Sequence, residues 1–294
     1  MKRLIVVVGP TAAGKTAEAV RLASCLDTEI VSCDSRQFYR ELNIGVARPS
    51  DEELAAVRHH FIACRSLLEP YNVFDFEHDA LRLLQSLFSR HDDVVAVGGS
   101  GLYIDALCNG ISVLPTPSAE LRAELQRQLR EEGIVALQRQ LEELDPVYFS
   151  RVDRDNPVRL QRALEVCLTA GKPYSSLLSE RAPQPRPFQI VYRMVTHAPE
   201  VLRERINRRV DQMLTDGLEQ EAMSLQPLWE QSHPQTLNTV GYKEFYEPLP
   251  PSENPSAPHT IPDWIKLNTW HYAKKQLTWF KKALHNQVSS NSEF

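Results

Sequence analysis

The first third of the chain alternates short apolar runs with amphipathic segments. Continuous apolar runs predict buried strands at Leu4–Val8, Ile30–Cys33 and Val94–Val97. Apolar residues at helical spacing predict helices at Gly14–Leu26 and Phe74–Ser89. Strands that alternate with helices in this way pair in parallel and carry helices on both faces of the sheet. The pattern therefore predicts an α/β fold around a parallel sheet.

The pattern then becomes helical before the α/β alternation returns. Amphipathic helix is predicted at Ala119–Leu144, with an interruption near Gly133, and at Val158–Ala170. A strand is predicted at Ile190–Val195, and long helices follow at Pro199–Leu225 and Trp264–His285. We therefore expect an α/β core formed by residues 1–115 and 188–294, with an all-helical subdomain inserted at 116–187.

A phosphate-binding motif connects the first strand to the first helix. Its residues fit the pattern G-x-x-x-x-G-K-[ST], in the strand–loop–helix context that such a loop requires: Gly9, Pro10, Thr11, Ala12, Ala13, Gly14, Lys15 and Thr16. Backbone N–H groups and Lys15 suit an anion, and the Thr16 hydroxyl can hold Mg²⁺. The motif predicts a P-loop NTPase-like core that binds a di- or triphosphate.

The second strand ends at an acidic residue, whereas the third does not. Nucleotide hydrolysis usually needs an apolar strand that ends in a metal-binding aspartate. Val94–Val97 instead leads into Gly98-Gly99, which disfavours a motor or switch ATPase. Asp34 follows the second strand, at the sheet edge where the P-loop lies. There it is a candidate general base, with helix capping or a water-mediated contact to Mg²⁺ as equal alternatives.

Composition indicates whether the protein is a membrane, secreted or cytoplasmic one. No apolar run approaches the length of about 20 residues that a membrane span needs. Five scattered cysteines without a C-x-x-C pair are typical of reduced cysteines in a cytoplasmic protein. The adjacent His59 and His60 would point apart on a strand or a helix, so we expect them to be structural and not metal ligands. We expect a cytoplasmic monomer without membrane contact.

The net charge of −5 conceals one basic segment. Between Trp264 and His285 there is no acidic residue, and aromatic side chains alternate with lysines that include Lys274 and Lys275. Lysines position RNA through its phosphates, and aromatic rings stack on exposed bases. The same aromatic spacing is also typical of a helix that packs on a core. We expect Trp279 to be packed and the lysines to face a nucleic acid.

Blocks spread over nearly the whole chain resemble the tRNA dimethylallyltransferase family. In chain order they are Gly9–Thr16, Asp34–Gln37 with Tyr39, Ile44–Pro49, His59-His60, Val97–Tyr103, Arg162–Val166, Val240–Lys243 and Ala273–Trp279. The resemblance implies transfer of a dimethylallyl group from its diphosphate to the exocyclic amine of the adenosine just 3′ of the anticodon. The acceptors would be tRNAs that read codons beginning with uridine, and Mg²⁺ would be the cofactor.

The resemblance also implies roles for individual residues. The P-loop, with Arg205 and Arg209, would hold dimethylallyl diphosphate, while Asp34 accepts a proton from the amine, with Lys15 and Ser100 as further catalytic residues. Ser100 stands where the family has threonine. Contacts to the tRNA anticodon stem-loop are implied for Asp34, Ser35, Arg36, Gln37, Ser100, Arg122, Gln161, Arg162, Ala163, Leu164, Glu165, Gly241, Tyr242, Lys243, Lys274 and Lys275.

Three alternatives remain on the residues alone. An adenylate isopentenyltransferase would prenylate free nucleotides, for which the basic helix and the insertion are unnecessary. A small-molecule P-loop kinase would bind ATP through Gly9–Thr16. A non-catalytic RNA-binding ATPase would need the acidic strand end that this chain lacks.

Overall fold

A computed structural model describes the chain except for residues 112–113, 180–183, 249–257 and 291–294, with the side chains of 285–290 also undescribed. The described residues form two compact units. The first joins Met1–Asn109 to Arg186–Phe294, and the second is Gly110–Pro185. The unit boundaries therefore lie a few residues before the predicted ones, because the helix of the first unit ends at Asn109 and the chain leaves it there.

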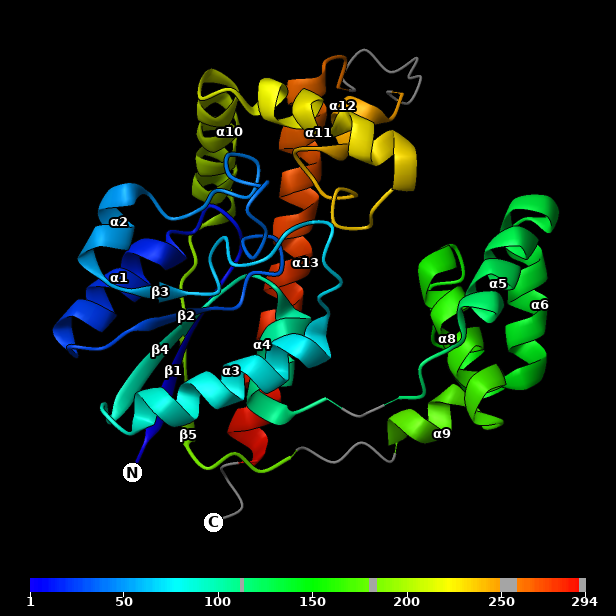
Figure 1. The fold of residues 1–294 in the computed structure, drawn as a ribbon, viewed down its shortest axis with the longest axis horizontal. Coiled ribbons are helices and arrows are strands. Elements are labelled where there is room, and N and C mark those ends of the chain that lie inside the picture. Colours follow the sequence, from blue (N-terminus) through cyan, green and yellow to red (C-terminus); the bar gives the residue numbers. More distant parts are fainter. Residues whose placement is uncertain (112–113, 180–183, 249–257, 291–294) are drawn as a thin grey trace. The chain divides into compact units, whose positions relative to one another are not determined.

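The first unit is built on a five-stranded parallel sheet (Figure 1). The strands are β1 (Arg3–Val8), β2 (Ile30–Ser32), β3 (His59–His60), β4 (Asp93–Val97) and β5 (Gln189–Met194). Their order is β3-β2-β4-β1-β5, so β4 lies between β1 and β2. The carboxyl ends of β1, β2 and β4 therefore meet at one edge, as the sequence predicts for the P-loop and Asp34.

Alternate strand residues face opposite layers of helices. Val7 and Val95 pack against α1 (Lys15–Cys25), together with Ala19 and Ala23 of that helix. Val6 belongs to the larger core, which contains residues of α3 (Val73–Phe88) and α4 (Gly101–Asn109). The strands are apolar on both faces because both faces are covered. This confirms the predicted α/β class.

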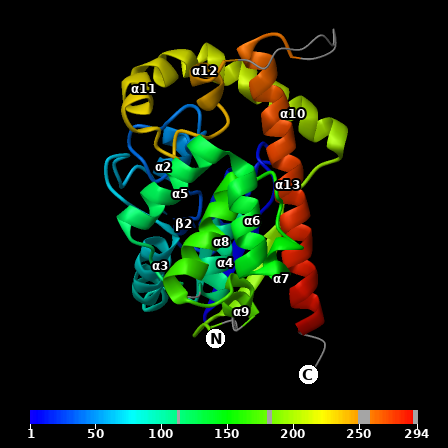
Figure 2. The same cartoon turned by 90° about the vertical axis from the view of Figure 1, so that its right-hand side faces the viewer.

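The C-terminal helices of the first unit differ from the prediction in number and in length. The single helix expected at Pro199–Leu225 is two helices, α10 (Pro199–Thr215) and α11 (Leu218–Ser232). Gly217 adopts φ 104° between them, a left-handed conformation that ends a helix. The last helix, α13 (Ile261–Ser290), is longer than predicted and runs beside α10 (Figure 2). Two short helices, α2 (Asp51–Ala56) and α12 (Lys243–Tyr246), complete the unit.

The second unit is helical, as the sequence predicts. Its helices are α5 (Ala119–Glu132), α6 (Ile134–Leu144), α7 (Pro146–Phe149), α8 (Pro157–Ala170) and α9 (Tyr174–Ser179). Gly133 separates α5 from α6, and Gly171 ends α8 in the left-handed region. Leu137, Leu141 and Leu160 are fully buried in its own core. The unit therefore has its own apolar centre.

His59 and His60 form the edge strand β3 and point apart. His60 Nε2 lies 2.7 Å from Glu29 Oε2, and His59 Nδ1 lies 2.8 Å from the Val57 carbonyl oxygen. No group of three or more His, Cys, Asp or Glu side chains among the described residues could hold a metal. Within the same residues, no helix is long and apolar enough to cross a bilayer.

Candidate active site

A cavity of about 390 Å³ lies at the carboxyl ends of the strands, within the first unit. Its lining comes from the P-loop after β1, the loop after β2, residues in and after β3, the glycines after β4, part of α10, residues 238–243 at the start of α12, and one face of α13. Ligands of open α/β sheets bind outside the carboxyl ends of the strands, where loops diverge. Both the P-loop and Asp34 line this cavity, so the structure brings together the two predicted centres.

The P-loop leaves the start of α1 open to an anion. Gly14 takes the N-cap position at φ 93° and offers no side-chain cap, so the first N–H groups of the helix keep their hydrogen-bonding capacity. Gly9 passes close to β5, where an added Cβ would lie 2.1 Å from the Val195 carbonyl oxygen. Thr16 lines the cavity at the start of α1. The geometry is that of an anion-binding loop.

Three cations surround this loop. Lys15 Nζ donates to the Pro10 carbonyl oxygen at 2.8 Å, and Arg205 Nε donates to the Ala12 carbonyl oxygen at 2.7 Å. Burial, reinforced by the charge of Arg209, lowers the pKa of Lys15 to about 8, although Asp34 opposes the shift. Burial also lowers the pKa of Arg209, with Arg205 adding to the effect. Partly buried positive charges that repel one another create a site that a polyanion would stabilise.

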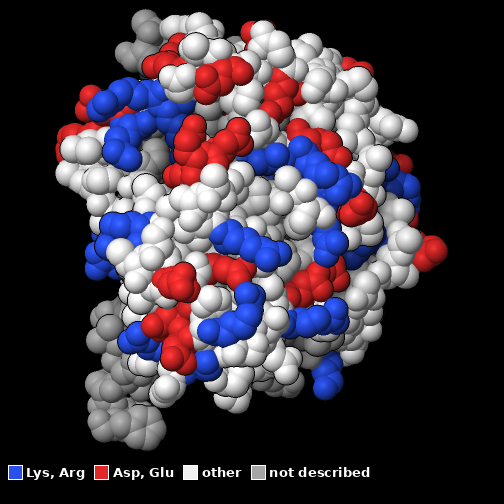
Figure 3. Space-filling view, turned by 60° about the vertical axis from the view of Figure 1, so that its left-hand side comes forward, with Lys and Arg blue, Asp and Glu red and all other residues white. Residues whose placement is uncertain are grey.

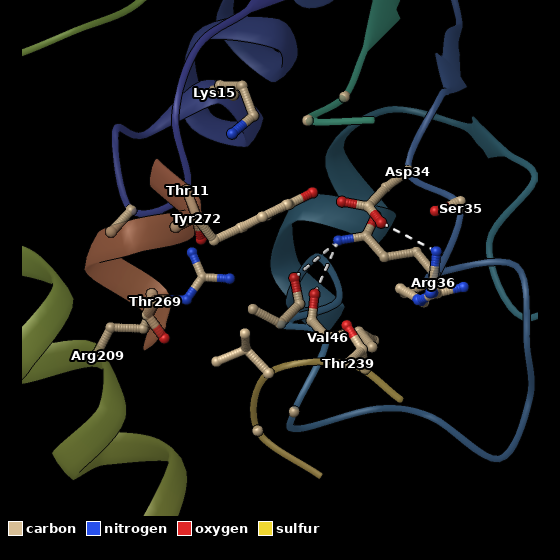
Figure 4. Close-up of a pocket in the computed structure, with 18 of the residues that line it drawn as sticks. Thr11, Lys15, Asp34, Ser35, Arg36, Val46, Arg209, Thr239, Thr269 and Tyr272 are labelled. Atoms are coloured by element: carbon tan, nitrogen blue, oxygen red, sulfur yellow. Dashed lines mark hydrogen bonds between the residues drawn. The ribbon is translucent and has the colours of Figure 1, made fainter. Parts of the chain in front are cut away.

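Asp34 stands opposite these cations (Figure 4). One of its carboxylate oxygens accepts the backbone N–H of Arg36 at 3.0 Å, so the capping role considered from the sequence is present. Asp34 also lines the cavity, and its other oxygen points into it (Figure 4). Capping therefore orients the carboxylate through one oxygen, while the other faces the cavity, where it can accept a proton.

Hydrogen bonds fix the loop that carries Asp34. Gln37 Nε2 donates to the carbonyl oxygens of Val46 and Ala47 at 3.3 and 2.9 Å (Figure 4). The Ser100 hydroxyl accepts the Ser35 N–H at 3.1 Å and lies 3.1 Å from Ser35 Oγ. The Ser100 hydroxyl thus positions the loop through Ser35, while its carbonyl oxygen accepts the N–H groups of Tyr103 and Ile104 at the start of α4.

One side of the cavity is apolar. Val46, Val210, Met213, Val240 and Ile265 all line it. Such a surface suits a short hydrocarbon chain attached to a charged head that the P-loop holds. The cavity therefore accommodates an amphiphilic phosphate ester better than a purely polar ligand.

Sequence reasoning missed the contribution of α13 to this cavity. Ile265, Thr269, Tyr272 and Gln276 all line it, at spacings of four, three and four residues. That spacing marks one face of a helix and was the signal available in the sequence. Gln276 accepts the Thr11 N–H at 2.8 Å and donates to the Gly99 carbonyl oxygen at 2.9 Å. It therefore joins the P-loop to the loop after β4.

The predicted tRNA contacts separate into surface and buried residues. Gly241 and Lys243 line the cavity, and Lys274 and Lys275 are exposed on α13. Tyr242 is fully buried and donates its hydroxyl to Glu221 at 2.5 Å, so its side chain is a core residue. The side chain of Tyr242 therefore offers no surface to RNA, and the predicted contact at this position, which stays a prediction, would have to come from the backbone.

A similar correction applies in the second unit. Ala163 and Leu164 are fully buried in its core, so their side chains form no surface. Glu165 gathers the other predicted residues: Gln161 at 3.3 Å, Arg162 at 3.3 Å and Arg122 at 3.8 Å. The predicted contact region of this unit is thus reduced to a polar cluster on α5 and α8.

The end of β4 differs from that of a nucleotide hydrolase. Gly98 and Gly99 line the cavity there, and Gly99 faces the Gln276 side chain. The acidic residue of this strand, Asp93, lies at its other end and pairs with Arg3 at 2.5 Å. The carboxyl end of β4 therefore carries no acidic residue, as the sequence predicts.

Comparison with known proteins agrees with this geometry. The family model described as IPP transferase matches residues 37–283. A tRNA dimethylallyltransferase from Christiangramia forsetii is 45% identical over 279 residues, 95% of this chain and 90% of the relative. A tRNA dimethylallyltransferase 1 from Bacteroides thetaiotaomicron is 42% identical, with 96% and 89% covered.

Solved structures of two enzymes also align with nearly all of this chain. A full-length tRNA isopentenylpyrophosphate transferase from Bacillus halodurans aligns with a TM-score of 0.66 at 34% identity, over 96% of this chain and 87% of that one. A eukaryotic dimethylallyltransferase acting on tRNA aligns with a TM-score of 0.76 over 95% and 70% of the two chains, and its 24% identity shows the fold alone. Because the family model spans most of the sequence and the relatives match nearly all of it, the chain belongs to the IPP transferase family.

Proposed function

We propose that this enzyme transfers a dimethylallyl group from dimethylallyl diphosphate to the exocyclic N6 amine of the adenosine at position 37 of tRNA. The product would be N6-(dimethylallyl)adenosine, in cytoplasmic tRNAs that read codons beginning with uridine. One observation carries the proposal: a single cavity places phosphate-binding cations opposite a carboxylate, with an apolar wall beside them. The names of the relatives agree with this activity.

The donor would bind with its diphosphate on the P-loop. Lys15, Arg209 and the amides at the start of α1 supply positive potential, and the apolar side chains accept the hydrocarbon. As the allylic C–O bond breaks, negative charge accumulates on the diphosphate. Preorganised cations in a desolvated site stabilise that charge strongly.

The residues around the loop also fit a Mg²⁺ ion. Thr16 offers a hydroxyl at the cavity, and Mg²⁺ commonly takes one or two protein ligands with phosphate oxygens and water as the rest. When bound, the ion adds positive charge next to the leaving diphosphate.

The acceptor amine would approach from the Asp34 side. A base embedded in the anticodon loop has to leave its stack to enter a cavity of this kind. The oxygen of Asp34 that faces the cavity would take the proton that the amine loses as it forms its new bond to carbon. Asp34 and Lys15 would therefore act on opposite ends of the transfer.

The RNA would extend beyond the cavity over basic surface. Lys274 and Lys275 on α13 and Lys243 near α12 are suitable phosphate contacts. The cluster formed by Arg122, Gln161 and Arg162 is the candidate contact in the helical unit. We further infer that the enzyme acts as a monomer.

A transfer assay tests the proposal directly. Purified protein, Mg²⁺, labelled dimethylallyl diphosphate and unmodified tRNA should yield one prenyl group per tRNA, and ATP should not replace the donor. Free AMP and ADP serve as alternative acceptors; faster prenylation of these than of tRNA would indicate an adenylate isopentenyltransferase. ATP consumption without prenyl transfer would contradict the proposal and favour a kinase or an ATPase.

A further inference from the structure

Tyr272 offers an aromatic ring to the centre of the cavity. It projects from α13, and 43% of its surface is exposed although it lines the cavity. Figure 4 shows the side chain reaching from the helix toward Asp34, with its hydroxyl end nearest that carboxylate. Burial of the hydroxyl and the charge of Asp34 raise the pKa of Tyr272 to about 12. The residue is therefore neutral near pH 7 and cannot compete with Asp34 as a base.

The ring lies along the path that a transferred group would follow. The leaving-group end of the cavity is marked by Thr11 and Arg209, and the acceptor end by Asp34. In the view of Figure 4, Tyr272 extends from the side where Thr11 and Arg209 are drawn toward Asp34, whose charge acts on its hydroxyl. The carbon that exchanges its bond to oxygen for a bond to nitrogen has to pass between those ends.

The bond changes of the proposed transfer place positive charge at that carbon. The C1–O bond breaks and its electron pair leaves with the diphosphate. The lone pair of the adenosine N6 forms the new C1–N bond, and the N6 proton passes to Asp34. In the transition state the allyl group carries partial positive charge, shared between C1 and the dimethyl-substituted carbon. The face of an aromatic ring attracts such a charge, most strongly where water is excluded.

We propose that Tyr272 is a catalytic residue whose ring contacts the transferring dimethylallyl group and stabilises the positive charge that develops on it. The inference rests on the proposed function. Lys15 and Arg209 stabilise the departing anion, whereas Tyr272 acts on the cationic fragment between that anion and the acceptor. Removing the ring should lower the rate of the chemical step about 10- to 30-fold. Binding of donor and tRNA should change little.

A graded series of rings at this position separates charge stabilisation from other roles. Single-turnover rates would be measured for Tyr272→Phe, Tyr272→Leu, and the chain with mono-, di- or pentafluorinated phenylalanine at position 272. We expect Tyr272→Phe to remain within about threefold of the wild type, because it keeps the ring face. The logarithm of the rate should fall steadily with fluorination, which weakens the negative ring face without removing the ring. Tyr272→Leu should be among the slowest.

Phe245 provides the matched control. It is a half-buried ring that packs against the main apolar core of the first unit and does not line the cavity. Fluorinated phenylalanine at position 245 should therefore leave the rate unchanged. Equal rates for Tyr272→Phe and Tyr272→Leu would overturn the inference and assign the effect to the hydroxyl. If fluorination at position 272 changes KM for tRNA but leaves the single-turnover rate constant, the inference is overturned, and the ring instead stacks on the adenine. A flat series in an active wild type rejects this inference alone, whereas an inactive wild type rejects the proposed function.

Discussion

At the residue scale, Asp34 combines two roles that the sequence left as alternatives. Its carboxylate accepts the N–H of Arg36, and this bond fixes the side chain in the cavity. A base that is held in place loses little conformational freedom when the substrate arrives. Capping and proton transfer are therefore compatible at one carboxylate.

Replacing Asp34 with asparagine should separate chemistry from binding. Asp34→Asn keeps an oxygen that can accept the Arg36 N–H, but it removes the proton acceptor. We expect prenyl transfer to fall by about 10²- to 10⁴-fold, the usual contribution of a general base. The binding constant for tRNA, measured by filter binding, should stay within about threefold. A fully active Asp34→Asn enzyme would show that another group takes the proton.

Glu29 provides a second test, of stability and its dependence on pH. Its carboxylate lies 2.7 Å from His60 Nε2 and 2.9 Å from Arg90, and it joins β2 to β3 and to the end of α3. Burial alone would raise the pKa of Glu29, but the hydrogen bond and charge of His60 and the charge of Arg90 leave it lower than the usual 4.5. Its contribution to stability is therefore present above pH 4.5 and is lost as pH falls through the lowered value.

Glu29→Gln should lower the free energy of unfolding by about 1–3 kcal/mol at pH 7, because His60 and Arg90 use different carboxylate oxygens and the amide keeps only one acceptor oxygen and no charge. The difference from the wild type should begin to shrink below pH 4.5, where the unfolded carboxylate takes up a proton, and should be lost as pH falls through the lowered pKa of the folded state. Urea unfolding over a series of pH values from 7 downward through this range would measure both effects. The exposed Glu219→Gln on α11 is the control and should change stability little at either pH. A difference that is constant with pH would contradict the ionic origin of the effect.

At the element scale, α13 connects parts of the sheet edge that are far apart in the sequence. Gln276 holds both Thr11 in the P-loop and Gly99 after β4 through buried hydrogen bonds. Trp279, one turn further along, lies against Gly101 at the start of α4. The helix is thus a structural support for the phosphate-binding end of the cavity as well as a basic surface.

Gln276→Leu should destabilise the P-loop. The change leaves the Thr11 N–H and the Gly99 carbonyl oxygen without their partner, which costs about 1–3 kcal/mol for a buried polar group. We expect KM for dimethylallyl diphosphate to rise about tenfold while the affinity for tRNA changes little. Thr278→Val, on the exposed face of the same helix, should alter neither quantity. An unchanged KM for the donor in Gln276→Leu would show that the loop keeps its shape without this support.

The same helix shows which features the sequence could predict. Local patterns identified four of the five strands and the P-loop, because apolar runs and glycine spacing are properties of neighbouring residues. The edge strand β3 was missed because its two histidines form no apolar run. The break at Gly217 was missed because apolar residues continue at helical spacing on both sides of it. Tyr272 and Gln276 reach the cavity only because α13 returns to the edge of the sheet more than 250 residues after the P-loop. No local pattern encodes that return.

At the scale of the whole molecule, charge is distributed unevenly. The chain carries a net charge of −5, yet an RNA-modifying enzyme needs positive surface where the RNA lies. Figure 3 shows the side of the first unit that carries α1 and α2 in Figure 1, where acidic and basic side chains are mixed. On α13, in contrast, the region from Trp264 to His285 has lysines and no acidic residue. Long-range attraction for RNA should therefore depend on this helix more than on the total charge.

Neutralising two of these lysines tests that distribution. Lys274 and Lys275 are exposed, and each phosphate contact that is lost removes the release of roughly one counterion on binding. Lys274→Ala with Lys275→Ala should weaken tRNA binding about tenfold at low salt and reduce the slope of log K against log salt by about 1 to 2.

The control changes Lys172, exposed in the helical unit but outside its polar cluster, to alanine. Because positioning contacts act before the chemical step, the double variant should recover its single-turnover rate at saturating tRNA. An unchanged salt slope would place the main phosphate contacts on other surfaces, with the polar cluster around Glu165 as the next region to test.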